Sequence, residues 1–244
     1  MKTFVGTAGW AIPRAHRDRF PDAGPCLARY AARLGAAEIN STFYRAHRAS
    51  TYERWAASVP RGFRFSVKLR RTVTHEHRLV GARRLVEGFL DEVAPLGTKM
   101  GCLLVQLAPS LEMNRRTARS FFTMVRRRYE GPIAFEPRHA SWFGAEVDSM
   151  LEDLQVSRVA ADPARAAGTI APGGWQGMAY FRLHGSPRMY FSPYEADFLD
   201  GIAAQIRALT RAGTPCWCIF DNTGSGAAAA DALDLAARLA RPKR

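Results

Sequence analysis

Cysteine is scarce in this sequence, with four among 244 residues, at positions 26, 102, 216 and 218. Because they are scattered and three of them lie in apolar segments, we expect free thiols and no disulfide framework. Cys216 and Cys218 would share one face of a predicted strand, but two ligands do not make a zinc site. Cysteine therefore gives no reason to predict a metal centre.

Long apolar stretches are also missing. No stretch approaches the roughly 18 apolar residues that a membrane-spanning helix needs. The N-terminus runs into a strand-like segment without an apolar signal region, so we expect a soluble cytoplasmic protein with no membrane partner. The length of 244 residues, 47% of them hydrophobic, is typical of one globular domain spanning residues 1–244.

Lysine is rare too, because four of the 35 basic residues are lysines and 31 are arginines. The formal charge of +13 is a feature that attracts nucleic-acid phosphates. The strong arginine bias, however, is more typical of overall composition than of a selected patch, and the arginine runs lie on or beside predicted helices, where solvated faces are usual. Nucleic acid therefore stays an alternative partner.

What the sequence does contain is a regular alternation of helix and strand patterns. Apolar residues with helical spacing predict seven helices, around residues 27–34, 52–59, 86–93, 118–125, 147–154, 199–206 and 232–239. Short apolar runs predict eight strands, at residues 3–8, 36–40, 63–68, 101–107, 132–136, 156–161, 178–184 and 215–220. This order and length predict an α/β fold, a single (β/α)8 TIM barrel.

Local signals refine this prediction at three places. Residues 162–177 are rich in glycine and proline, which predicts a loop in place of a regular helix after the sixth strand. The segments 50–53 and 192–195 resemble capping boxes, which predicts that helices begin there, the second with Pro193 at its first helical position.

Polar side chains gather where the predicted strands end, and active sites of such barrels lie at that end. Ionisable groups drawn together at one barrel end are typical of acid–base chemistry on a charged substrate. We predict Glu136 and His184 as proton carriers, and Glu38 as a further catalytic carboxylate. Lys68 is one of only four lysines, and its amine is predicted to act in catalysis or to hold an anion.

The remaining strand-end residues are predicted to bind the ligand. Arginine holds phosphate or carboxylate in a fork, and exposed aromatic rings stack on sugars or bases. Since side chains alternate along a strand, either Arg138 or His139 must turn away unless the strand has already ended. The predicted ligand-binding set is Asn40, Tyr44, His75, Gln106, Arg138, His139, Trp142, Arg182, Asp221 and Asn222.

Several of these segments resemble one family. They are residues 38–44 (EINSTFY), 63–68 (FRFSVK), 74–75 (TH), 106–110 (QLAPS), 136–142 (EPRHASW), 180–185 (YFRLHG) and 220–223 (FDNT). In this order they are similar to the YecE-like family, domain of unknown function 72, over nearly the whole chain. The resemblance implies a TIM barrel and implies no established activity.

Three functional hypotheses follow from the sequence. The first is an enzyme that uses acid–base chemistry on a small anionic substrate, phosphorylated or polyhydroxylated. The alternatives are a protein that binds or processes nucleic acid and a non-catalytic scaffold for a protein partner. No cofactor is predicted, although Glu38, Glu136, His184 and Asp221 form an alternative ligand set for a divalent metal. The sequence makes no prediction of the oligomeric state.

Overall fold

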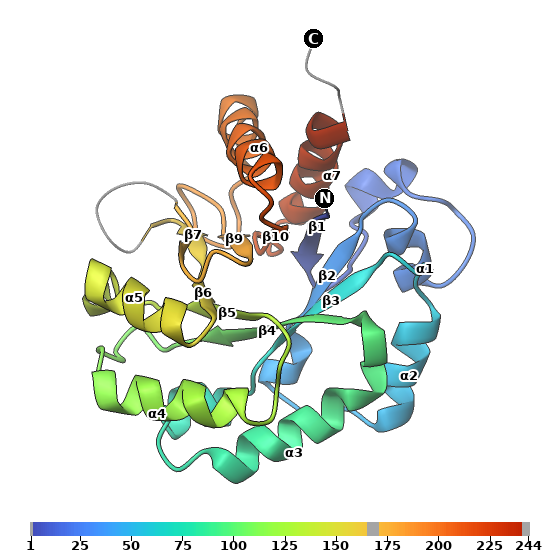
Figure 1. Ribbon diagram of the computed structural model, residues 1–244. Helices are drawn as coiled ribbons and strands as arrows, with labels where there is room; N and C mark the ends of the chain where they lie inside the picture. Colours follow the sequence, from blue (N-terminus) through green and yellow to red (C-terminus); the bar gives the residue numbers. More distant parts are fainter. Residues whose placement is uncertain (1, 165–170, 241–244) are drawn as a thin grey trace.

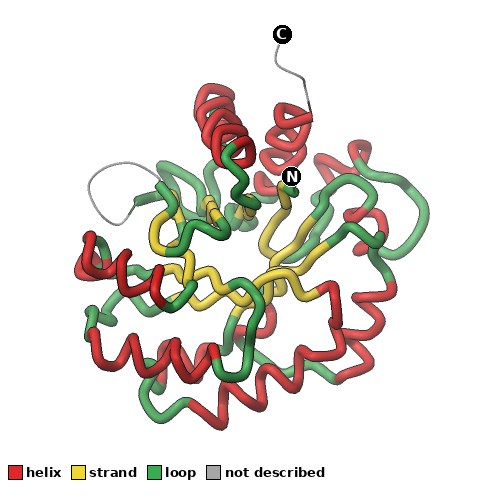
Figure 2. The backbone as a smooth tube through the Cα atoms, viewed as in Figure 1, coloured by secondary structure: helices red, strands yellow, loops and turns green. Residues whose placement is uncertain are grey.

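Parallel strands form the inner wall of the molecule, and helices cover its outside (Figure 1). The computed structural model describes residues 2–164 and 171–240. The tube in Figure 2 shows how strands and helices alternate along the chain around this wall. The α/β fold and the TIM-barrel architecture are thus as the sequence predicts.

Ten strands make one sheet in the order β7-β9-β10-β1-β2-β3-β4-β5-β6-β8, and every pairing is parallel except that of β6 with β8. Each predicted strand is present within one or two residues. The bounds are β1 Thr3–Ala8, β2 Ala36–Ile39, β3 Arg64–Lys68, β4 Met100–Gln106, β5 Ile133–Glu136, β6 Val156–Arg158, β7 Ala160–Asp162, β8 Gly173–Gly174, β9 Ala179–Leu183 and β10 Cys216–Phe220.

All seven predicted helices are present outside the wall. Their bounds are α1 Cys26–Ala31, α2 Ala49–Ala57, α3 Arg83–Val93, α4 Arg115–Arg126, α5 Ala145–Asp153, α6 Ala196–Arg211 and α7 Ala227–Ala240. Short helical turns complete the connections, at Arg14–Arg19, Ser41–Phe43, Thr72–Glu76, Ala94–Lys99 and Ala140–Trp142. Within the described chain, no helix is both long and apolar enough to cross a membrane.

The sixth predicted strand is divided into β6 and β7. β6 pairs with β5 on one side, whereas β7 pairs with β9 on the other. The amide of Val159, between the two halves, donates to Phe135 O at 2.8 Å. The barrel therefore closes through one strand that changes its partner midway. The described parts of the predicted loop 162–177 contain β8 and no helix, and residues 165–170 lie outside the described residues.

Both predicted capping boxes are wrong. Helix α2 begins at Ala49, one residue before Ser50, and its N-cap residue makes no side-chain capping bond. Helix α6 begins at Ala196 after an extended Glu195, so Pro193 is not its first helical residue. The Ser192 hydroxyl instead accepts a hydrogen bond from the Arg188 amide at 3.0 Å, within the preceding turn. A serine that already serves a turn is not free to cap the next helix.

The core has two parts, because successive strand side chains face opposite sides of the wall. Outward-facing residues such as Val67, Phe135 and Phe181 pack against the helices. The lower and middle levels inside the barrel are filled by a second apolar cluster that includes Tyr180, Trp217 and Ile219. Three of the four cysteines are buried and all are free thiols, as predicted.

A tyrosine hydroxyl joins β1 to β2 at the point where the strands come closest. A Cβ atom on Gly6 would lie 1.9 Å from the Ala36 carbonyl oxygen, so this position needs glycine. Beside it, the Tyr30 hydroxyl accepts from the Thr7 amide at 2.8 Å and donates to Ala36 O at 2.9 Å. Tyr30 therefore satisfies one buried backbone group on each strand.

Tyr30→Phe is expected to lower the free energy of unfolding by about 2–4 kcal/mol, because it leaves two buried backbone groups unpaired. Tyr52→Phe is the matched control, since the Tyr52 hydroxyl donates only to Glu92 Oε1, which keeps its bond from the His47 amide. The control is expected to lose about 1 kcal/mol. Urea denaturation of both variants tests this, and equal losses would contradict it.

Candidate functional site

The inner faces of the strands become charged at their carboxyl ends. Along β9 the inward residues run from Tyr180 to Arg182 and then His184, and along β10 from Trp217 and Ile219 to Asp221. The alternation that fills the lower barrel with apolar groups thus delivers ionisable groups to its top. The buried polar residues at this level include Glu38, Lys68, Gln106, Glu136, Arg138, Arg182, His184 and Asp221.

Arg182 is the centre of this cluster, and its side chain is fully buried. Its Nε and Nη2 atoms donate to the two carboxylate oxygens of Glu38, at 2.9 and 2.8 Å. Nη1 lies 3.2 Å from Glu136 Oε2 and Nη2 lies 2.9 Å from Asp221 Oδ2. One guanidinium therefore contacts three carboxylates.

In this structure the Arg182 guanidinium is directed at carboxylates of the protein, and the prediction that it holds an external anion stays a prediction. Although burial opposes the charged form, the carboxylates of Asp221, Glu38 and Glu136 raise the pKa of Arg182 well above its usual value. The guanidinium stays charged, but its hydrogen bonds are already used inside the protein. A strand-end arginine can serve a ligand or a buried carboxylate, and the sequence does not distinguish the two.

The carboxylates are held in their ionised form. Burial alone would raise the pKa of Glu136, but Arg182, His184 and Arg138 together hold it well below its usual value. The pKa of Asp221 is likewise lowered, because Arg182 and His184 outweigh its burial. Both groups are therefore hydrogen-bond acceptors at neutral pH.

His184 lies between two of these carboxylates. Its Nε2 atom is 2.9 Å from Glu136 Oε1, and its Nδ1 atom is 3.2 Å from Asp221 Oδ2. Arg138 Nη1 is 3.3 Å from the same Nε2 atom. An imidazolium can donate to both carboxylates, whereas a neutral ring can donate from Nδ1 and accept at Nε2 from Arg138. Both protonation states therefore have hydrogen-bond partners.

Lys68 differs from the other cations in the cluster. Its Nζ atom lies 4.2 Å above the centre of the Phe43 ring, and among the described residues it has no hydrogen-bond acceptor or ion-pair partner. Burial, followed by the charge of Arg182, lowers the pKa of Lys68 to about 8, against the opposing effect of the nearby carboxylates. Lys68 is thus a cation whose charge is poorly compensated and easily lost.

The charged side chains of the cluster differ in their exposure to solvent. Glu38, Glu136 and Arg182 are 0% exposed, whereas Lys68 and Arg138 are 5% and 8% exposed. Arg138 Nη1 donates to Glu136 Oε1 at 2.9 Å, and Arg138 Nε is buried without a partner. The two cations that approach solvent are therefore the ones with unused hydrogen-bonding capacity.

Three other predicted residues also lie in or beside the cluster. Gln106 Nε2 donates to Glu136 Oε1 at 3.0 Å. Asn40 follows the end of β2, and its Oδ1 atom is buried without a partner. The His75 ring packs edge-on against Phe43 at 5.0 Å, next to Lys68, whose charge adds to burial in lowering the pKa of His75.

Trp142 is a correction to the predicted set. It is 1% exposed, its indole N–H donates to Leu111 O at 2.8 Å, and its ring packs against Phe135 at 5.0 Å. The ring belongs to the apolar core outside the barrel, so it is not available to stack on a ligand. Tyr44, by contrast, is 71% exposed and touches Phe43 with its ring edge.

His139 and Asn222 also have other partners. His139 Nδ1 lies 2.9 Å from the Ser141 hydroxyl, so this side chain turns to the outer connection while Arg138 turns inward. Asn222 Nδ2 donates to Asp231 Oδ2 and to Ser192 O, which fixes the loop before α6. Both side chains thus bond to groups of the protein, and their predicted contact with a ligand stays a prediction.

Two further residues contribute to the cluster. The Tyr180 hydroxyl lies 2.9 Å from Ser66 Oγ and 3.3 Å from Glu38 Oε2, so it supports the cluster from below. Phe43 lies under the Lys68 amine. Tyr180 could have been found, because it precedes Arg182 by two residues and so shares its face.

A positively charged side chain of the protein already lies among the residues proposed as an alternative metal site. The guanidinium of Arg182 bonds to three of the four proposed ligands. Across residues 2–164 and 171–240, no group of three or more histidine, cysteine, aspartate or glutamate side chains is arranged to hold a metal ion.

Comparison with known proteins agrees with the fold. A family model described as "Protein of unknown function DUF72" matches residues 4–244. The UPF0759 protein YecE of Escherichia coli K12 is 28% identical over 104 residues, which span 43% of this chain and only 37% of that protein. A DUF72 family protein from Thermotoga maritima MSB8 superposes with a TM-score of 0.83 at 23% identity, covering 99% of this chain and 100% of its own. One from Enterococcus faecalis V583 gives 0.82 at 19% identity, covering 99% and 97%.

Arg182→Met is expected to lower the free energy of unfolding at pH 7 by about 3–5 kcal/mol, because it leaves three buried carboxylates without their shared partner. The loss should shrink below pH 4. In the wild type the lowered pKa of Glu136 and of Asp221 contributes stability that is fully present above their unfolded pKa near 4 and is lost as the pH falls from there through the lowered values. Denaturation at pH 7 and at pH 3 measures this.

Arg119→Met is the control, since the Arg119 pair with Asp153 is exposed. It is expected to cost less than about 1 kcal/mol. A variant at position 182 that is as stable as this control would contradict the central role of the guanidinium.

Lys68 is expected to lose its proton near pH 8, about two units below an ordinary lysine. The chain has four lysines, so the 13Cε signal of Lys68 can be followed by NMR in lysine-labelled protein and assigned by its absence in Lys68→Arg. A midpoint above pH 10 for that signal would show that the amine is not desolvated as the structure implies.

Proposed function

This chain belongs to the DUF72 family, whose description states no function, and from its strand-end cluster we propose that it is an enzyme that moves protons on a small anionic substrate. The substrate class is a phosphorylated or polyhydroxylated compound. The fold supports this placement, since barrels of this kind carry their active sites at the same end.

The observation that carries the proposal is the position of His184. One ring nitrogen faces Glu136 at 2.9 Å and the other faces Asp221 at 3.2 Å, while Arg138 can donate to Nε2 when the ring is neutral. A general acid–base group takes up and releases a proton during the reaction. His184 has a hydrogen-bond partner for either form of its ring and is the proposed proton carrier.

Glu136 has a narrower role in this proposal than the sequence predicts. Because its pKa is held well below the usual value, chiefly by Arg182, it is a weak base. Its carboxylate accepts hydrogen bonds from His184 and Arg138 and so orients both. Asp221 orients the imidazole from the other nitrogen, as a carboxylate does in other histidine-based sites.

Lys68 and Arg138 are the proposed anion-binding groups. Both approach solvent, and neither has all of its donors paired within the described chain. An anion at Lys68 would favour the charged amine, whose pKa lies near 8. Affinity for the anion should therefore fall as the pH rises through 8.

The test is a thermal-shift panel of sugar phosphates and inorganic phosphate at physiological salt, followed by NMR of the shifting compounds in D2O. At 100 times its dissociation constant a ligand adds about 2.7 kcal/mol of stability. We expect at least one sugar phosphate to raise the melting temperature at pH 7 and less so at pH 9. We also expect the wild type to exchange its C–H protons or to form a product.

Lys68→Arg should keep the shift but lose its decline between pH 7 and pH 9, since arginine stays charged, and Lys68→Met should lose the shift. His184→Asn should keep the binding and lose at least about a hundredfold in rate, the scale of one acid–base group. If no compound shifts or reacts, the enzyme proposal fails. A thermal shift only with short single-stranded oligonucleotides would favour a nucleic-acid-binding protein. No shift with either class of compound would favour a partner-binding scaffold.

A further inference from the structure

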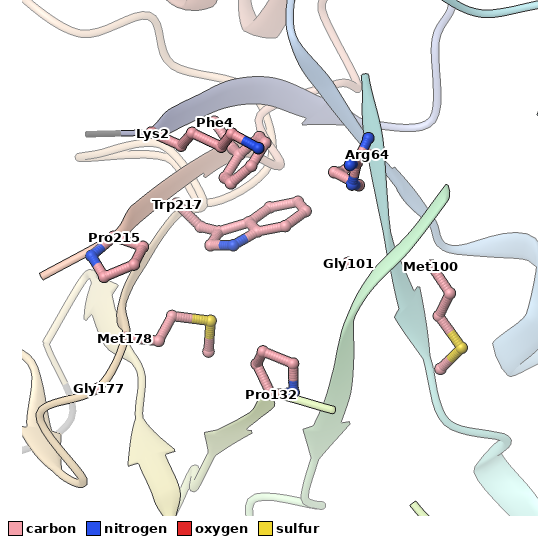
Figure 3. A pocket seen from close by; sticks show the side chains of 10 residues that line it. All are labelled: Lys2, Phe4, Arg64, Met100, Gly101, Pro132, Gly177, Met178, Pro215 and Trp217. Carbon is pink, nitrogen blue, oxygen red and sulfur yellow. The ribbon is translucent and has the colours of Figure 1, made fainter. Parts of the chain in front are cut away.

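The opposite end of the barrel contains a cavity of about 480 Å³ that plays no part in the proposed chemistry. It lies where the strands begin, and Figure 3 shows the Trp217 ring at its centre, with Phe4 on one side and Met178 and Pro132 on the other. The volume falls within the range of small-molecule sites. Its lining is Lys2, Phe4, Arg64, Met100, Gly101, Pro132, Gly177, Met178, Pro215 and Trp217.

The cavity lies at the end of the barrel where β6 and β9 are not paired. Gly101 lets the Trp217 ring come close, because a Cβ atom on this residue would lie 2.7 Å from the ring. At this level β6 pairs with the short antiparallel β8 and not with β9. The wall is therefore interrupted next to Gly177 and Met178, which precede β9.

The body of the cavity is apolar and adaptable. The Trp217 ring stacks on Phe4 with the ring centres 4.6 Å apart and lies nearly parallel to Tyr180 at 6.0 Å, so aromatic contacts hold it in place. Met178 and Met100 add flexible thioether side chains, which fit ligands of varied shape. The lining favours a hydrocarbon portion of a ligand.

The rim carries positive charge without a matching carboxylate. Arg64 Nη1 donates to the backbone carbonyls of Arg61 and Phe63, each at 2.8 Å, and the nearby Lys99 amine also bonds to backbone carbonyls. In the described part of the chain, neither of these cations nor Lys2 forms an ion pair with an acidic side chain. No acidic residue lines the cavity. The charge of Arg64 also helps burial to lower the pKa of Lys99.

We propose that this cavity binds a small amphipathic carboxylate, with its hydrocarbon portion against Trp217 and Met178 and its carboxylate at Arg64 and Lys2. Burial of the apolar part drives binding, and the unpaired cations select an anionic head over a neutral or positive one. The site lies at the barrel end away from His184 and Lys68 and does not depend on the proposed acid–base chemistry.

The test uses decanoate as the probe, with decanol as its uncharged match, in isothermal titration calorimetry of the full chain at physiological salt. We expect saturable binding of decanoate and at least tenfold weaker binding of decanol, which corresponds to the loss of one charge-assisted interaction. The double variant Lys2→Gln and Arg64→Gln should weaken decanoate binding by a similar factor. Met178→Trp should block the cavity and abolish binding.

Arg83→Gln together with Arg84→Gln is the charge-matched control on the exposed start of α3, and it should leave decanoate binding unchanged. Lys68→Met should do so as well, which separates this site from the strand-end cluster. Absence of decanoate binding, equal affinity for decanol, or an unchanged affinity in the double variant would each overturn the proposal.

Discussion

The buried contact of Arg182 with Glu38, Glu136 and Asp221 holds the strands together at the carboxyl end of the barrel. Those three carboxylates come from the ends of three different strands, and each lies within 3.2 Å of the guanidinium inside the wall. The guanidinium ties β2, β5 and β10 to β9 at one level. It also sets the field in which the neighbouring groups act, since it lowers the pKa of Glu136 and of Lys68 alike.

Along the barrel axis the inward-facing side chains change from apolar to charged. Below the cluster the inward positions are apolar, and Tyr180 forms the boundary: its hydroxyl reaches Ser66 and Glu38, while its ring stacks parallel to Trp217 at 6.0 Å. One residue thus belongs to both regions. The barrel interior thus has a polar end and an apolar end within one wall, and Tyr180 contacts both.

Much of this arrangement can be predicted from the periodicity of the sequence. The rest depends on which side chains pair across the barrel, which periodicity does not show. Alternation along a strand places Arg182 and His184 on one face, and that inference holds in the structure. The same reasoning does not show that the donors of Arg182 bond to carboxylates of the protein, because those carboxylates lie on strands that are distant in the sequence. The sequence predicts that Trp142 contacts a ligand, but the ring packs in the core. An aromatic residue just after a strand looks the same in the sequence whether it stacks on a ligand or packs under a loop. Ser192 failed as a helix cap because a turn uses its hydroxyl first.

The division of the sixth strand has a consequence for how the chain can tolerate changes in length. Val159 is the residue at which the strand leaves β5 for β9, and three residues later the Asp162 carbonyl accepts the His184 amide at 2.8 Å. Inserting or deleting one residue between 156 and 162 would turn every following side chain to the opposite face and remove that contact from His184. A change of length inside this stretch is therefore expected to disturb both the closure of the barrel and the backbone contact of His184.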